Sequence, residues 1–189
     1  MPRFSWAAWG LLVVVLDLPL AGWDVLPDLV GYAWLFVGVA GGPALHAGFA
    51  RARAAALVGI PVSVITGTPF TNNLVGLEWG AAFAGILINV VVLHQLATAI
   101  RDLDPTVGDS DQRRWANGIR IAAPIAGGVQ LVGLVLLATV LAIFYVLGLL
   151  ALVVVGIIAV VLLHRVNRAG WLATATPATP ADPAEPVTP

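Results

Sequence analysis

The stretch NGIRIAAPIAGGVQLVGLVLLATVLAIFYVLGLLALVVVGIIAVVLLH, residues 117–164, carries a single charged side chain, that of Arg120. As one continuous helix with a rise of 1.5 Å per residue it would be about 72 Å long. The hydrocarbon core of a bilayer is only roughly 30 Å thick. The stretch must therefore fold back and cross a membrane twice. We expect the turn within residues 142–148, where Tyr145 would lie at the membrane interface.

The composition of the whole chain indicates an integral membrane protein. The 189 residues are 60% hydrophobic and 10% charged, and the mean hydropathy is +0.97. A soluble domain, which needs a polar surface, does not have this composition. The absence of Cys excludes disulfides and thiolate metal ligands. The net charge of −1 excludes the basic field that nucleic-acid binding requires.

Apolar runs near the length that spans a bilayer as a helix, about 20 residues, divide the chain into six predicted spans. They cover residues 4–20, 29–49, 54–68, 77–100, 117–140 and 146–164. We therefore predict an all-α fold, an integral membrane bundle of six transmembrane helices within residues 1–172. The Pro-, Ala- and Thr-rich segment 173–189 has no apolar face and is predicted to be a disordered tail.

The arginines predict how the bundle is oriented, because short cytoplasmic loops collect basic residues. With six spans, all nine fall on one side of the membrane. Five spans would leave Arg165 and Arg168 outside. We therefore predict a multi-pass protein of the prokaryotic plasma membrane with both termini cytoplasmic. If the N-terminal segment were instead a cleaved signal peptide, five spans would remain and the charge bias would be lost.

The sequence GWDVLPDLVGY, residues 22–32, is the predicted outer connection between the first two spans. Pro27 can open the second helix near its first turn, where an acid complements the helix dipole. Asp24 and Asp28 are expected in water or the headgroup layer, and Tyr32 in an aromatic belt. These features predict a capped, tight hairpin, with ligand binding by the acids as the alternative.

Two further carboxylates belong to the same outer face. Asp17 lies in the last turn of the first span, where the helix dipole disfavours an acid and the surroundings are partly desolvated. Without a basic residue on this side, its partner would be an amide, a hydroxyl, water, a cation or a proton. Glu78 begins the fourth span. Together with Asp24 and Asp28, these acids suit a hard cation or a cationic solute, although inert polar loops would have the same composition.

Three polar residues fall within the predicted spans. Asn89 and Gln130 lie near the middle of the fourth and fifth spans, and buried amides in a bilayer form interhelical hydrogen bonds. His94 lies on another part of the helix surface and nearer the cytoplasm. It would be an interfacial side chain or part of a proton relay or metal site. We retain all three, with the four carboxylates, as candidate ligand-binding residues; a metal is left undetermined.

Signatures of catalysis are missing from the sequence. No serine stands in a Gly-x-Ser-Gly element, and there is no His-Glu-x-x-His helix, Walker loop or Gly-x-Gly-x-x-Gly turn. We therefore predict no catalytic residues, no cofactor and no enzymatic activity. An enzyme that acts on lipid-borne substrates is a third alternative to the two functions given below.

Residues 24–32, DVLPDLVGY, resemble an element written F-D-I-L-P-D-x-x-G-Y in small bacterial polytopic membrane proteins, with Trp23 in place of the Phe. The element covers about one twentieth of the chain, and the resemblance implies fold and location without an activity. In length and number of spans the chain is also similar to the substrate-binding membrane subunits of vitamin importers. It lacks their Ala-x-x-x-Ala element, because Ala7 is followed by Leu11.

We expect a non-enzymatic membrane protein that binds or transports a small solute or cation at its acidic outer face. The alternative is a structural or accessory subunit that docks another membrane protein or a second copy of itself. Small residues four positions apart allow close helix packing. Such pairs are Gly38 with Gly42, Ala81 with Gly85, and Ala123 with Gly127.

Overall fold

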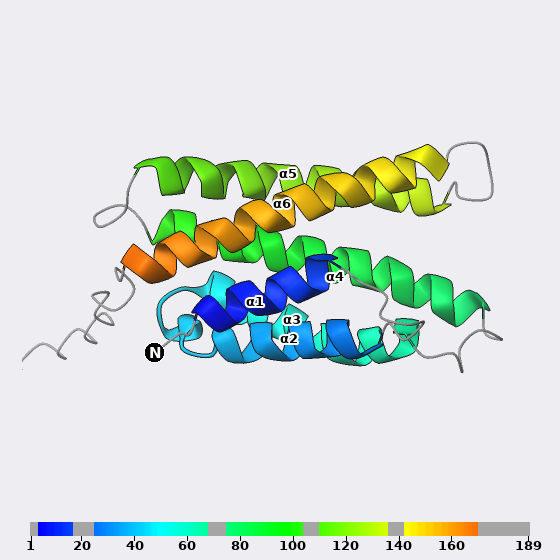
Figure 1. Ribbon diagram of the computed structural model, residues 1–189, viewed down its shortest axis with the longest axis horizontal. Helices are drawn as coiled ribbons and strands as arrows, with labels where there is room; N and C mark the ends of the chain where they lie inside the picture. Colours follow the sequence, from blue (N-terminus) through cyan, green and yellow to red (C-terminus); the bar gives the residue numbers. More distant parts are fainter. Residues whose placement is uncertain (1–3, 17–24, 68–74, 104–109, 136–141, 170–189) are drawn as a thin grey trace, which may run out of the picture.

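A computed structural model describes residues 4–16, 25–67, 75–103, 110–135 and 142–169 of the chain (Figure 1). These residues form an all-α structure of six α-helices and one short 3₁₀ helix. The helices are α1 (Phe4–Leu16), α2 (Val25–Gly38), η1 (Gly42–Ala44), α3 (Ala47–Gly67), α4 (Val75–Asp102), α5 (Ser110–Val135) and α6 (Ala142–Ala169).

The six α-helices form a closed ring. Successive helices run in opposite directions, and each packs against its neighbours in the chain (Figure 1). Helix α1 also packs against α6, which closes the ring. The beginning of α1 and the end of α6 therefore lie at the same end of the bundle, on the left of Figure 1.

Four described stretches are long and apolar enough to cross a membrane, which identifies the class as a membrane protein. They are Ala47–Thr66, Trp79–Asp102, Asp111–Val135 and Ile143–Arg168. Helices α1 and α2 are apolar but have only 13 and 14 residues. At 1.5 Å per residue each is about 20 Å long, less than the hydrocarbon thickness. Residues 17–20 of the first predicted span lie outside the described part.

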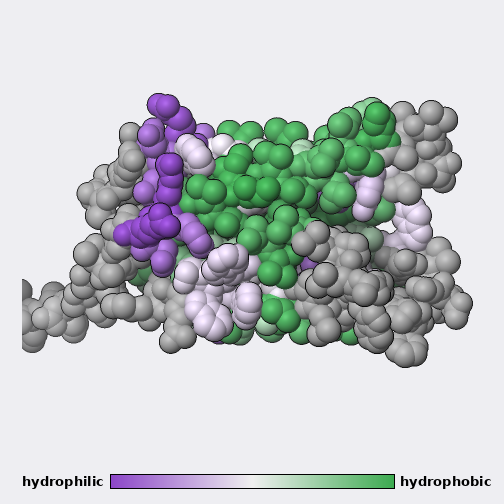
Figure 2. All heavy atoms as spheres, viewed as in Figure 1, coloured by the Kyte–Doolittle hydropathy of each residue, from purple (hydrophilic) through white to green (hydrophobic). Residues whose placement is uncertain are grey.

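The exterior of the bundle is largely apolar. Figure 2 shows a broad hydrophobic band with hydrophilic residues gathered at one end, where α6 ends and α5 begins. Among the described apolar side chains, Ile125 is 62% exposed and Leu150 is 56% exposed. Contiguous apolar surface on this scale is rare on soluble monomers, and it matches a lipid environment.

The described arginines lie at one end of the bundle, here called the arginine end. They are Arg51 and Arg53 near the start of α3, Arg101 in the last turn of α4, Arg113, Arg114 and Arg120 in the first half of α5, and Arg165 and Arg168 near the end of α6. The opposite end of the described helices carries no arginine. The antiparallel order of the helices thus collects basic residues from four separate segments.

The second predicted span, residues 29–49, is wrong. Helix α2 ends at Gly38, the chain turns through η1, and α3 begins at Ala47. Because none of residues 29–49 is charged, hydropathy does not mark the turn; the Gly-Gly-Pro sequence at 41–43 does, since proline cannot continue the hydrogen bonding of a helix. Arg51 and Arg53 therefore belong to α3 and not to a loop.

Two further predicted boundaries are wrong. The turn expected at 142–148 is helical, because α6 begins at Ala142 and these apolar residues include no proline. Gly148 instead permits close packing, since a Cβ there would lie 2.5 Å from the Cα of Gln130. The predicted spans leave residues 101–116 as the connection between the fourth and fifth spans. The observed connection is shorter, because α4 extends to Asp102 and α5 begins at Ser110.

Glycines set the closest helix crossings in the ring. A Cβ at Gly10 of α1 would lie 2.5 Å from the carbonyl oxygen of Gly31 in α2. Gly38 packs on Ala7, and Gly127 packs on Val90, which confirms the close packing expected at these two glycines. At Gly85, by contrast, a Cβ would meet nothing within 4 Å.

Candidate functional site

The ring of helices encloses a cavity of about 190 Å³, here called the central cavity, to which all six α-helices contribute side chains. At about 30 Å³ per water it has room for roughly six water molecules, which is smaller than a site for a drug-sized ligand. Most of the lining is apolar. Its described polar residues are Asp28, Tyr32, Ser63, Thr66, Asn89, Gln130 and Tyr145.

The central cavity lies toward the end opposite the arginines. Asp28 is in the first turn of α2, Thr66 is one residue before the end of α3, and Tyr145 is near the start of α6. Thr66 is exposed, so the cavity reaches the surface here. No described basic residue lines it, and the site is therefore not organised around an anion.

Tyr32 is the most buried aromatic residue of the cavity. It is 4% exposed, and its hydroxyl donates a 2.8 Å hydrogen bond to Oδ1 of Asn89 in α4. Its ring lies against Gly59 of α3, where a Cβ would be 2.7 Å from the ring. The interhelical hydrogen bond predicted for Asn89 is thus confirmed. The placement of Tyr32 in an aromatic belt is wrong, because the missing side chain at Gly59 lets the ring lie inside the bundle.

The two hydroxyl groups of α3 in the cavity donate their protons to the helix itself. Ser63 Oγ donates to the carbonyl oxygen of Ile60 at 2.8 Å, and Thr66 Oγ1 donates to that of Ser63 at 3.2 Å. A carbonyl can only accept, so each hydroxyl has given up its one proton. What the two oxygens retain are lone pairs, which can accept hydrogen bonds from a ligand.

Gln130 of α5 lies with its side chain in the cavity lining and is 4% exposed. Its Oε1 is buried and has no hydrogen-bond partner among the described residues. Leaving a buried acceptor without a donor costs about 1 to 3 kcal/mol. Such a group in a folded protein calls for a specific explanation. Oε1 of Gln95 and Oε1 of Gln112 are buried without a described partner in the same way, but of the three glutamines Gln130 is the one in the described cavity lining.

Asp28 contributes the described carboxylate of the cavity. It is half-buried, with Oδ1 fully buried, and it lies in the first turn of α2, as predicted, where the helix dipole favours an acid. Its side chain lines the central cavity, inside the ring of helices. Asp28 and Tyr32 are four residues apart and hence on one face of α2, and this face is turned into the ring. The four-residue spacing of Asp28 and Tyr32 is the sequence signal for this shared face.

The remaining predicted site residues lie elsewhere. Asp17 and Asp24 fall outside the described residues. Glu78 belongs to the first turn of α4, and its side chain is outside the described part. His94 is turned to α5, where its Nδ1 donates to the carbonyl of Arg120 at 3.0 Å. The structure therefore brings Asp28, Asn89 and Gln130 to one cavity, whose described lining does not include His94.

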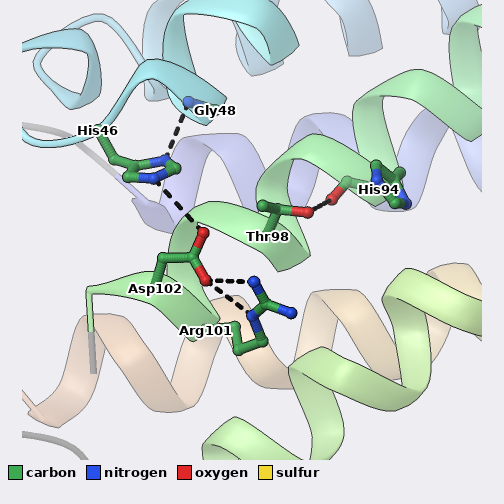
Figure 3. Close-up of polar contacts among 6 residues, drawn as sticks. All are labelled: His46, Gly48, His94, Thr98, Arg101 and Asp102. Carbon is green, nitrogen blue, oxygen red and sulfur yellow. Dashed lines mark hydrogen bonds and ion pairs between the residues drawn. The ribbon is translucent and has the colours of Figure 1, made fainter. Parts of the chain in front are cut away.

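At the arginine end, Asp102 of α4 contacts Arg101 of the same helix and His46 of the turn before α3 (Figure 3). Its carboxylate is 2.5 Å from Nη2 of Arg101 and 3.6 Å from Nε2 of His46. The other ring nitrogen of His46 accepts the N–H of Gly48 at 3.0 Å in the first turn of α3. His46 thus lies between α2 and α3, outside the second span in which it was expected.

Thr98 lies on α4 between His94 and the contacts of Asp102. Its Oγ1 donates to the carbonyl of His94 at 2.7 Å (Figure 3). In the described part of the chain, no three His, Asp or Glu side chains gather in a way that could hold a metal ion. Of the contacts drawn in Figure 3, the one between His46 and Asp102 joins α4 to the turn before α3.

Comparison with protein-family models, with curated proteins and with solved structures gives no match in any of the three. The functional inference consequently depends on the chemistry of the central cavity. That cavity combines a carboxylate, hydroxyl oxygens whose protons are already engaged, and a buried amide oxygen. It can accept hydrogen bonds from a ligand and can compensate one positive charge.

Proposed function

We propose that the protein is a six-span protein of the prokaryotic plasma membrane, with the arginine end and both termini in the cytoplasm. The positive-inside bias supports this orientation, because basic residues from four segments share one end of the bundle. The central cavity then faces the exterior. Two residues of the D-x-L-P-D-x-x-G-Y element, Asp28 and Tyr32, line that cavity, which supports a functional role for the element.

We further propose that the central cavity binds, and helps to move, a small solute that carries at most one positive charge and that either donates hydrogen bonds or is coordinated by oxygen atoms. A monovalent cation or a small protonated amine has these properties. The observation that carries the proposal is the buried Oε1 of Gln130, which lacks a described donor in the same cavity as the Asp28 carboxylate. One carboxylate balances one charge, and the hydroxyl oxygens of Ser63 and Thr66 complete an acceptor-rich lining.

The test is a binding series on the purified full-length protein in detergent. Thermal unfolding is measured with sodium, potassium, ammonium, methylammonium and choline chlorides at constant ionic strength. At least one small cation is expected to raise the unfolding temperature, whereas choline is expected to have no effect, because its methyl groups leave no N–H to donate and keep oxygen atoms away from the charged nitrogen. A solute that gives a shift is then titrated by calorimetry.

Two variants assign that binding to the cavity. Asp28→Asn is expected to weaken cation binding at least about tenfold, because a charge-assisted hydrogen bond is lost. Gln130→Leu is expected to weaken it about fivefold. The matched controls are Asp111→Asn, also in a first helical turn, and Gln95→Leu, which removes a buried amide outside the described cavity lining. Equal behaviour of variants and controls would refute the proposal.

A second candidate function is an accessory subunit that docks another membrane helix. It is favoured by Gly76 and Gly80 of α4, which are exposed and four residues apart, and at which a Cβ would meet nothing within 4 Å. Such spacing lets a partner helix approach closely. Loss of a copurifying membrane protein in Gly80→Leu, with solute binding absent in the wild type, would favour this function.

A further inference from the structure

A second hollow lies on the exterior surface of the bundle, between α5 and α6. It shares no described lining residue with the central cavity. This groove has a volume of about 330 Å³, and its described lining comes from these two helices. The lining consists of Trp115, Gly118, Ile119 and Ala122 of α5 and Val155 and Ile158 of α6. A Cβ at Gly118 would meet nothing within 4 Å, so the missing side chain at this position keeps the groove open.

Positive charge lies beside this groove at the arginine end. The guanidinium of Arg165 lies over the ring of Trp115, 4.9 Å from its centroid. Arg114 and Arg168 are also exposed on the same two helices. Among the described residues of α5 and α6, Asp111 is the single acidic residue. Figure 2 shows the resulting hydrophilic band directly beside the apolar surface.

We propose that this groove is a binding site for an anionic phospholipid of the leaflet at the arginine end. One acyl chain occupies the apolar groove, and the headgroup phosphate is held by Arg165 with Arg114 beside it. Arginine binds phosphate oxygens in a bidentate manner, and basic pockets between transmembrane helices bind anionic headgroups. Trp115 occupies the interfacial position that tryptophan favours, and its ring holds Arg165 at the mouth of the groove.

The charge complementarity identifies the occupant. An uncharged or zwitterionic lipid would fill the apolar groove equally well, but it would not compensate the exposed guanidinium groups. The lipid site is independent of the proposed solute binding, because the two hollows are formed by different residues. A failed solute experiment therefore leaves this proposal intact, and the reverse also holds.

Native mass spectrometry of the full-length protein tests the site. The protein is delipidated in detergent and titrated separately with dioleoylphosphatidylglycerol and dioleoylphosphatidylcholine. We expect phosphatidylglycerol to bind at least fivefold more tightly, and Arg165→Gln to reduce that preference by about fivefold. Arg51→Gln, which removes an exposed charge from α3 at the same end, is the control with equal net charge and should retain the preference.

A second pair of variants tests the groove. Gly118→Leu places a side chain in the acyl-chain position and is expected to abolish the tight phosphatidylglycerol adduct. Gly128→Leu is the control, since a Cβ there also meets nothing within 4 Å and the residue is exposed outside both hollows. Equal binding of the two lipids by the wild type would overturn the proposal, as would equal lipid binding by the two leucine variants. Because the lipid comparison uses the unmodified chain, it holds even if a variant fails to fold.

Discussion

The two ends of the bundle hold their polar side chains in different ways. At the arginine end, charged side chains near the surface contact one another or an aromatic ring, as Asp102 contacts Arg101 and Arg165 lies over Trp115. Buried atoms at this end, such as Nε of Arg53 and Oε1 of Gln112, also lack a described hydrogen-bond partner. At the opposite end, polar side chains face the central cavity, and the buried oxygen of Gln130 has no partner among the described residues. The first arrangement suits an interface with headgroups and water, and the second suits a ligand.

This difference determines how strongly each end should respond to mutation. The side chains of His46 and Asp102 are 28% and 33% exposed, and ion pairs of this kind contribute from nothing to about 1 kcal/mol. Polar groups inside the ring lie in a medium of lower dielectric, where an unmade hydrogen bond costs more. Substitutions at the cavity end should therefore have larger effects, and one of them should have the opposite sign.

The largest effect is expected for Gly148→Leu, which would disrupt the close packing of α6 against α5 beside the cavity. The new Cβ would overlap the backbone of Gln130, which cannot move aside as a flexible side chain can. We expect a loss of at least about 3 kcal/mol in unfolding free energy, measured by SDS-induced unfolding in mixed micelles. Gly128→Leu, at an open position of α5, should unfold like the wild type. If the Gly148→Leu variant were as stable as the wild type, the close approach of α5 and α6 at this residue would be contradicted.

Tyr32→Phe is expected to have the next largest effect. It leaves Oδ1 of Asn89 without its described hydrogen-bond donor and should lower the unfolding free energy by about 1 kcal/mol. Tyr145→Phe also removes a hydroxyl from the cavity lining, but from a residue without a described hydrogen-bond partner. The same unfolding assay should show a smaller change for Tyr145→Phe. The α2–α4 hydrogen bond would be in doubt if the order were reversed.

Gln130→Leu should stabilise the ligand-free protein, by about 0.5 to 1 kcal/mol, because it replaces a buried acceptor without a described donor by an apolar group of similar size. The same change should weaken solute binding, as a site that trades stability for function would predict. His94→Leu, which removes the hydrogen bond to the carbonyl of Arg120, should destabilise instead. Destabilisation by Gln130→Leu would indicate that the amide serves the fold.

The smallest effect is expected for Asp102→Asn at the arginine end. Loss of the exposed contacts with Arg101 and His46 should cost no more than about 0.5 kcal/mol. Since surface charges are screened by salt, the difference from the wild type should shrink when unfolding is measured in 1 M rather than about 0.1 M salt. A loss of more than about 2 kcal/mol in unfolding free energy would mean that Asp102 is a main stabilising contact of the fold. The two ends of the bundle would then not differ in their sensitivity to mutation.

Parts of the fold and site could be predicted from local sequence. The charge-poor stretch 117–164 had to fold back because of its length, and α5 and α6 confirm this. Asp28 could be placed in the first turn of a helix from Pro27 and the helix dipole. The interhelical hydrogen bond of Asn89 followed from its position in an apolar span. These conclusions depend on length, local backbone chemistry or the cost of an unpaired polar group, all of which a sequence displays directly.

Other parts depended on contacts between distant residues. Tyr32 could not be placed inside the ring without knowing that Gly59 would lie under its ring. Nothing local indicates that α1 packs against α6, and this contact closes the wall around the cavity. His94, five residues after Asn89, was kept as a site residue although it contacts a different helix.

The amino-acid order alone was thus sufficient for the membrane class, the all-α character and the gathering of arginines on one side. Packing alone determined which face of each helix is turned inward. It therefore also determined that Asp28, Asn89 and Gln130 line one cavity. The physical reason is that lipid tails are as apolar as leucine. A membrane helix therefore has no strong hydrophobic contrast between its faces, and close contacts at residues such as Gly10 and Gly148 set its rotation.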